Sequence, residues 1–191
     1  MKKRFFSLAI VVCALLFAQL AQADLVTNAG FETGDFTGWT ITPASSGSVL
    51  GVSTTAPLSG SYAAYFGALG TTDDTISQVL ATTAGRSYTV SFWVDHPYPV
   101  SSNNFNAYWD GTTLLSLDDA GNFPYTEYTF TVAGTGSDTL SLAGREVFSW
   151  YYLDDVSVML SSVPVPEPYT ILLFGSGLVG LAAYRIRFRK A

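Results

Sequence analysis

Residues 24–162 alternate apolar and polar side chains with a period of two, which constrains the fold more than any other feature. In segment 86–94 the residues Tyr, Val, Phe and Val occupy every second position, and segment 125–132 has the same alternation. Segments 137–143 and 151–160 are similar, and no stretch has a sustained helical period with caps. Successive side chains of a strand point to opposite faces, so each segment has one face to bury. The pattern predicts an all-β domain, an antiparallel β-sandwich.

Turn signals divide this region further. Asp110-Gly111 predicts a two-residue hairpin turn, because both residue types tolerate a positive φ. The Ser- and Gly-rich segment 43–57 predicts a loop. Further strands are expected at residues 26–31, 39–42, 62–66, 75–80, 105–109 and 112–117.

The N-terminus has the three parts of a secretory signal peptide. Cations at positions 2–4 precede an apolar run over residues 5–17. Ala21 and Ala23 then fit the small-x-small pattern of a cleavage site. An uncleaved membrane anchor is the alternative, but the apolar run is short for a full span. We therefore predict an N-terminal signal-peptide helix that is removed after Ala23.

The C-terminus combines two prolines, an apolar segment and a cluster of cations. A new helix begins after Pro168, because Pro166 and Pro168 on either side of Glu167 interrupt any preceding helix. A helix over residues 169–188 would be about 30 Å long, which matches the hydrocarbon core of a bilayer. The basic tail 185–190 would then stay cytoplasmic; its arginines are Arg185, Arg187 and Arg189. The predicted domains are a signal peptide at 1–23, a β-sandwich at 24–162 and a segment with a transmembrane helix at 163–191.

This tripartite C-terminus resembles the PEP-CTERM sorting signal of Gram-negative bacteria. The resemblance implies that an exosortase, a membrane protease-transpeptidase, recognises the chain near Pro166-Glu167-Pro168. It also implies export across the inner membrane of a cell that makes exopolysaccharide, first as a membrane-anchored precursor. The mature protein would then reside in the cell envelope or outside the cell. A plain C-terminal membrane anchor is the alternative.

The middle region also resembles a known family. Residues 28–39 read Asn-Ala-Gly-Phe-Glu-Thr-Gly-Asp-Phe-Thr-Gly-Trp, which resembles the opening of carbohydrate-binding-module-like jelly rolls with a galactose-binding-like fold. Residues 59–66, 76–92 and 152–158 match later strands of that family in the same order. The resemblance implies a jelly-roll β-sandwich, although one fold can carry many functions.

The resemblance implies a structural calcium ion that ties the first strand region to the last. Glu32 and Asp154 would supply carboxylate ligands, and Asp155 could substitute if the last strand is bulged. The alternative is that these acidic residues are solvated turn and edge residues.

Sugar binding is the second candidate, because pyranose rings stack on exposed aromatic side chains beside polar groups. Trp93 lies on the otherwise polar face of its segment, and Tyr125 and Glu127 lie on the polar face of another. Further aromatic candidates near strand ends are Tyr98, Tyr108, Trp109 and Trp150.

Composition excludes several other classes of function. Between residues 24 and 163 there are 14 acidic residues and only two basic ones, Arg86 and Arg145, which is unsuited to nucleic acid. The one cysteine, Cys13, falls in the signal peptide, so neither a disulfide framework nor a thiolate metal site is expected.

Signs of catalysis are weak. The single histidine, His96, precedes Pro97 in an apparent loop, and neither a G-x-S-x-G nor an H-E-x-x-H motif occurs. We therefore expect a non-catalytic exported protein that binds exopolysaccharide. The alternatives are a structural or adhesive matrix protein and, less favoured, a polysaccharide-active enzyme.

Overall fold

The computed structural model describes residues 23–45, 47–100 and 102–161. Most of the predicted signal peptide and all of the sorting segment lie outside these residues; Ala23 is exposed at their start. Over the described ranges, no helix has the length and apolarity needed to cross a membrane.

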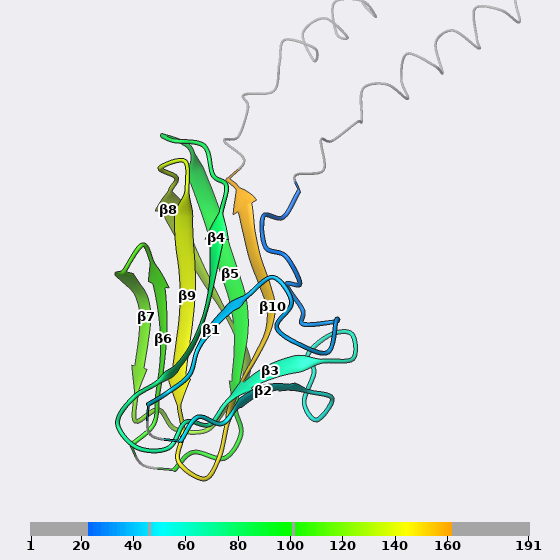
Figure 1. Cartoon of the computed structure of the whole chain (residues 1–191), viewed down its shortest axis with the longest axis vertical. Coiled ribbons are helices and arrows are strands. Elements are labelled where there is room, and N and C mark those ends of the chain that lie inside the picture. Colours follow the sequence, from blue (N-terminus) through cyan, green and yellow to red (C-terminus); the bar gives the residue numbers. More distant parts are fainter. Residues whose placement is uncertain (1–22, 46, 101, 162–191) are drawn as a thin grey trace, which may run out of the picture. The chain divides into compact units, whose positions relative to one another are not determined.

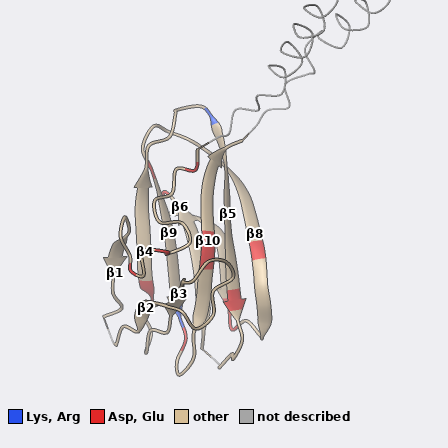
Figure 2. Ribbon diagram, turned by 90° about the vertical axis from the view of Figure 1, so that its right-hand side faces the viewer, with Lys and Arg blue, Asp and Glu red and all other residues tan. Residues whose placement is uncertain are grey.

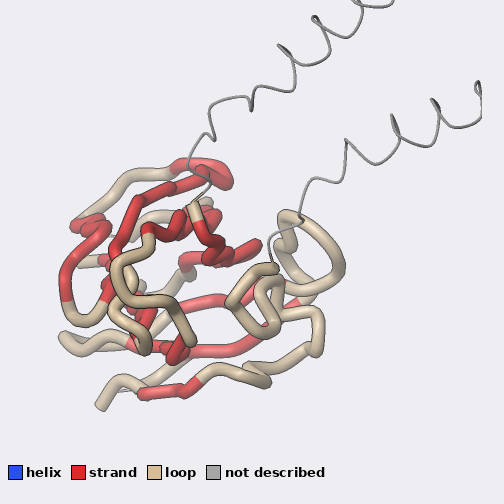
Figure 3. The backbone as a smooth tube through the Cα atoms, turned by 90° about the horizontal axis from the view of Figure 1, so that it is seen from above, coloured by secondary structure: helices blue, strands red, loops and turns tan. Residues whose placement is uncertain are grey.

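Ten strands form two antiparallel sheets, which confirms the predicted all-β sandwich (Figure 1). No described segment is helical (Figure 3). The first sheet has the order β1-β4-β9-β6-β7, and the second has the order β2-β3-β10-β5-β8. The strands are β1 (Thr40–Thr42), β2 (Leu50–Ser53), β3 (Ala63–Phe66), β4 (Asp74–Leu80), β5 (Ser87–His96), β6 (Asn104–Trp109), β7 (Thr112–Asp118), β8 (Phe123–Ala133), β9 (Asp138–Arg145) and β10 (Tyr151–Leu160).

Aromatic side chains between the two sheets form the centre of the core. Phe105 on β6 of the first sheet lies 5.6 Å from Phe66 and 6.4 Å from Phe92, between ring centroids, and both partners belong to the second sheet. All three rings are fully buried. Val90, Phe92 and Val94 on β5 are also inaccessible to solvent. The face that the period-two pattern predicts to be buried is therefore buried in the structure.

The turn at Asp110-Gly111 is confirmed, with φ values of 48° and 77° between β6 and β7. Two local predictions are wrong. Segment 26–31 is not a strand, because Asn28 and Phe31 have positive φ values and turn the Phe31 ring into the core against Trp39. The predicted loop at 43–57 contains β2, a short strand that pairs with β3.

Candidate functional site

The second sheet has an outward face that carries most of the sugar-binding candidates. On β5 the buried Val94 lies between Trp93 and Asp95, so these two side chains point away from the core. Trp93 pairs with Glu127 on β8 and with Asp154 on β10. In Figure 2, β10, β5 and β8 lie side by side with acidic segments on each. The structure thus brings Trp93 and Glu127 together.

A row of aromatic side chains runs along the same face. Asp95 pairs with Tyr152 on β10, and Tyr152 pairs in turn with Tyr65 on β3. Burial raises the pKa of the Tyr152 hydroxyl, and the nearby Asp95, Tyr98 and Tyr65 raise it further. Tyr98 follows Asp95, the cross-strand partner of Tyr152, by three residues, so the loop that carries Tyr98 begins beside Tyr152.

The segment 54–62 crosses the β8 and β10 side of this face. Its Ala56 carbonyl accepts a 2.6 Å hydrogen bond from the Tyr125 hydroxyl. Its Leu58 and Ser59 amides donate to the Asp154 carboxylate at 2.8 and 3.2 Å. Burial raises the pKa of Asp154, although these N–H donors oppose the effect. Tyr125 therefore supports this segment and is only partly free to contact a ligand.

Beside segment 54–62 lies a hollow of about 610 Å³, within the usual size range of small-molecule sites. Four aromatic side chains line it: Tyr62, Tyr65, Trp150 and Tyr152. Three residues with hydroxyl side chains, Ser53, Thr54 and Thr55, lie beside them, and two valines complete the described lining. The nine described lining residues include no charged side chain. Aromatic faces beside neutral hydroxyl groups suit an uncharged, hydroxyl-rich ligand.

Two glycines fix the positions of the rings in this hollow. A β-carbon on Gly67 would lie 2.7 Å from Cδ1 of Trp150, so only glycine leaves room for the indole there. Gly51, the cross-strand partner of Tyr65, likewise has the phenol ring directly above it. The rings are therefore held against the backbone of neighbouring strands before any ligand arrives.

The three predicted calcium ligands meet around Gly30. Carboxylate oxygens of Asp154 and Asp155 lie 3.6 and 3.5 Å from the position that a β-carbon on Gly30 would take, and Glu32 is adjacent. A register shift follows Asp154 on β10, and Asp155 has a φ of 47°, so two neighbouring acidic residues reach the same place.

Backbone amides occupy the oxygens of these carboxylates. Glu32 accepts hydrogen bonds from Ser61 and Tyr62 at 2.9–3.0 Å, and Asp154 accepts three from Leu58, Ser59 and Asp155. Within the described ranges, no group of three or more His, Cys, Asp or Glu side chains is placed to hold a metal ion. In this arrangement the residues do not offer the open set of oxygen ligands that calcium needs, and calcium binding stays a prediction.

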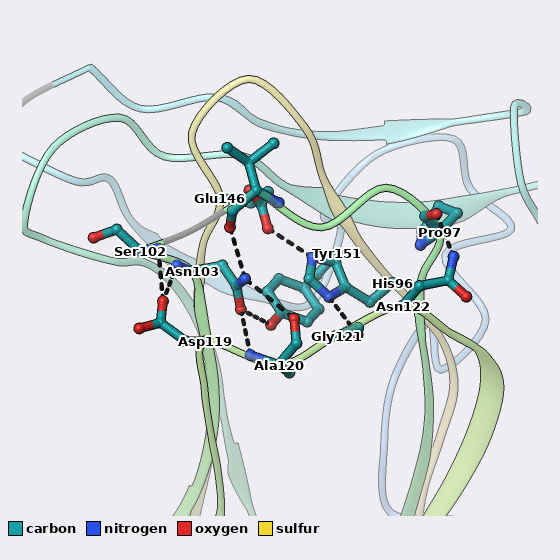
Figure 4. Close-up of polar contacts among 11 residues, drawn as sticks. His96, Pro97, Ser102, Asn103, Asp119, Ala120, Gly121, Asn122, Glu146 and Tyr151 are labelled. Atoms are coloured by element: carbon teal, nitrogen blue, oxygen red, sulfur yellow. Dashed lines mark hydrogen bonds and ion pairs between the residues drawn. The ribbon is translucent and has the colours of Figure 1, made fainter.

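His96 is the last residue of β5 and is fully buried, not exposed in a loop. Its Nε2 atom lies 2.6 Å from Oε2 of Glu146, and its Nδ1 atom lies 3.2 Å from the Gly121 carbonyl (Figure 4). Tyr151 stacks on the imidazole with ring centroids 3.9 Å apart. Both ring nitrogens are engaged away from solvent, so His96 is not available as a base to a substrate.

Trp109 does not belong to the outward face. It is only 6% exposed, and its indole N–H donates to the Ala133 carbonyl at 3.2 Å. The sequence prediction put Trp109 at the surface because the residue ends a strand. In the structure Trp109 belongs to the core. Tyr108 precedes it on the first sheet, whereas Trp150 lines the hollow.

Two facing antiparallel five-stranded sheets place this chain in the class of jelly-roll β-sandwiches. The chain belongs to the carbohydrate binding domain family, whose model matches residues 23–142. A PEP-CTERM protein-sorting motif matches residues 164–190, which confirms the resemblance of the C-terminus. Such a motif implies export and processing at a membrane by an exosortase, and the combination fits an exported glycan-binding protein.

Solved structures share the fold at low sequence identity. TmCBM61 in complex with β-1,4-galactotriose is 18% identical with a TM-score of 0.54, and the alignment covers 73% of this chain and 99% of that one. The CBM22-1 xylan-binding domain from Paenibacillus barcinonensis Xyn10C is 18% identical with a TM-score of 0.53, over 76% and 99% of the two chains.

A third similar structure is the enzymatically active domain of the bacteriophage CBA120 tailspike protein 4. It is 12% identical with a TM-score of 0.56, and the match covers 72% of this chain but only 21% of that one. A comparison with curated proteins gave no significant match. At these identities the structural likeness establishes the fold alone.

Sequence reasoning did not assign a ligand role to Tyr65, Tyr152 or Asp95. Tyr65 and Asp95 alternate with buried residues on their strands, which was a usable signal for an outward position. Tyr152 lies in a run of buried residues and is itself only 8% exposed, so burial alternation gives no such signal for it. What joins them to one row is the register of β3, β10 and β5, three strands that are distant in sequence.

Proposed function

We propose that this protein is a non-catalytic component of the Gram-negative cell envelope or extracellular matrix that binds exopolysaccharide through the outward face of its second sheet. The observation that carries the proposal is the hollow in which Tyr62, Tyr65, Trp150 and Tyr152 lie beside three hydroxyl side chains. The apolar face of a pyranose stacks on aromatic rings, and its hydroxyl groups pair with neutral polar groups.

The non-catalytic part of the proposal rests on the positions of the titratable groups. His96 is buried in a pair with Glu146, and three N–H donors hold the Asp154 carboxylate. Asp74 accepts hydrogen bonds from the Ala44 and Val49 amides, and Asp119 accepts them from the Ser102 and Asn103 amides. None of these described groups is placed as an exposed acid beside an exposed base.

The test is retention of the full chain on exopolysaccharide from the bacterium that makes it, in a detergent without a sugar head group. We expect Tyr65→Ala and Trp150→Ala each to weaken binding about tenfold, because each removes one stacking ring. Tyr108→Ala, which removes an aromatic residue from the first sheet, is the control and should bind as the parent does.

Failure of the parent chain to bind the exopolysaccharide would refute the proposal. Self-association of the same chain in sedimentation experiments, without glycan retention, would then favour the structural or adhesive alternative. Turnover of the polymer that a single carboxylate substitution abolishes would favour an enzyme.

A further inference from the structure

Two loops at one end of the sandwich expose large apolar side chains. The β5–β6 loop carries Tyr98, which is 74% exposed, and Val100, which is 40% exposed. The β9–β10 loop carries Phe148, which is 85% exposed, and Trp150, which is 40% exposed. We call these four residues the tip patch.

The loops that carry the tip patch are anchored from below. Glu146, two residues before Phe148, accepts hydrogen bonds from buried His96 at 2.6 Å and from the Val100 amide at 3.2 Å. Tyr151, which follows Trp150, stacks on His96 and donates its hydroxyl proton to Asn103 (Figure 4). A fully buried network therefore joins both loops and fixes how their exposed rings are presented.

Phe148 has a second unusual property. Its φ of 69° lies in the left-handed region, which is disfavoured for a bulky residue. Glu146 and Tyr151, on either side of Phe148, are held by the buried network, while the Phe148 ring is left in solvent. An aromatic side chain that is kept exposed on a strained, anchored loop contributes little to the core, and this arrangement is typical of binding surfaces.

The tip patch is continuous with the hollow. Trp150 belongs to both, and Phe148 precedes it by two residues, so their Cα atoms are at most about 7 Å apart. On the other side, Tyr98 lies in the loop that begins two residues after Asp95, the cross-strand partner of Tyr152, and Tyr152 also lines the hollow. The patch lies at the start of β10, whereas the described chain leaves the sandwich at the far end of that strand (Figure 1).

We propose that the glycan-binding surface extends from the hollow over the tip patch, so that Phe148 and Tyr98 stack on sugar units of a long chain beyond those that fill the hollow. This extension rests on the proposed function. It makes an extended polysaccharide, rather than a short oligosaccharide, the preferred ligand. Continuity with the hollow through Trp150 favours a glycan over a second copy of the chain or a lipid surface.

The test measures dissociation constants of the full chain for exopolysaccharide fragments separated by length. For Phe148→Ala and Tyr98→Ala we expect unchanged binding of the shortest bound fragments and about tenfold weaker binding of long ones. Trp150→Ala should weaken binding at every length. Val79→Ala, which shortens an exposed apolar residue on the first sheet, is the control and should leave the binding of both short and long fragments unchanged.

A Phe148→Ala effect that is equal at all lengths, or absent at all lengths, would refute the extension while leaving the hollow as the binding site. If Phe148→Ala abolishes self-association or binding to lipid vesicles and leaves the dependence of glycan affinity on fragment length as in the parent, the patch binds a second copy of the chain or a membrane instead. If the parent chain binds no fragment of any length, the proposed function itself fails.

Discussion

At the scale of single residues, the His96–Glu146 pair connects the two loops that carry the tip patch. Both side chains have no solvent exposure, and the two imidazole nitrogens face oxygen atoms of Glu146 and Gly121. Removing one partner of a buried hydrogen bond leaves the other polar group unpaired, so its desolvation penalty is no longer compensated.

We therefore expect Glu146→Ala to lower the free energy of unfolding by about 1–3 kcal/mol. Chemical denaturation monitored by fluorescence measures this directly. Glu127→Ala, which truncates an exposed glutamate on β8, is the control and should change stability by less than about 0.5 kcal/mol. Equal effects of the two substitutions would contradict a structural role for the buried pair.

Asp138 gives the clearest pH dependence. Burial opposes its ionisation, but hydrogen bonds from Thr82 and Thr135 outweigh burial and lower its pKa to about 2. A carboxylate with a lowered folded-state pKa stabilises the protein above its unfolded pKa, near 3.9, and this stabilisation is lost as the pH falls toward 2.

Asp138→Asn should accordingly be less stable than the parent at neutral pH, and the difference should shrink as the pH drops from about 4 to 2. Unfolding midpoints measured across this range provide the test. A stability difference that stays constant over the whole range would show that ionised Asp138 contributes nothing specific.

At the scale of strands and loops, the sequence predicts outward-facing positions best where the pattern of a single strand determines them. Alternation on β5 and β8 predicted outward positions for Trp93 and Glu127, and the structure places them opposite each other. It could not give the register of strands distant in sequence, which adds Tyr65 and Tyr152 to the same face. It also missed the turn at Asn28 and Phe31, because left-handed backbone conformations interrupt an otherwise strand-like pattern.

The acidic clasp around Gly30 is formed by a loop and two chain segments. Glu32 holds the amides of Ser61 and Tyr62, and Asp154 holds those of Leu58 and Ser59, so the segment over the outward face is tied to both the N-terminal turn and β10. Hydrogen bonds from amides to ionised carboxylates are strong, so these contacts help to hold the segment in place.

We expect Glu32→Ala to lower the unfolding temperature by several degrees, because it leaves two amides without their charged acceptor. Addition of a chelator to the parent tests the calcium prediction separately. If the chelator lowers it, and Glu32→Ala removes that response, then calcium binds at the clasp as the family resemblance implies.

At the scale of the whole molecule, charge restricts the ligand. The region from residue 24 to 163 has 14 acidic residues against Arg86 and Arg145. Arg145 lies 3.4 Å from Asp73 and donates to the Gly70 carbonyl, away from the second sheet. The described outward face carries Asp95, Glu127 and Asp154 without a cation, so its potential repels carboxylated polymers.

A neutral exopolysaccharide should therefore bind more tightly than the same polymer bearing carboxylates. The preference should be strongest at low ionic strength, where the Debye length is about 30 Å, and weaker at physiological salt. Affinity measurements with a carboxylated polymer and its carboxyl-reduced form at several salt concentrations test this. Tighter binding of the carboxylated form at low salt would contradict it.

A crystal structure of the protein with a bound fragment of exopolysaccharide tests the proposed binding site most directly. We expect sugar rings in van der Waals contact, within about 4.5 Å, with the faces of Tyr65, Trp150 or Tyr152. A fragment bound on the first sheet, with those three rings left in solvent, would contradict it.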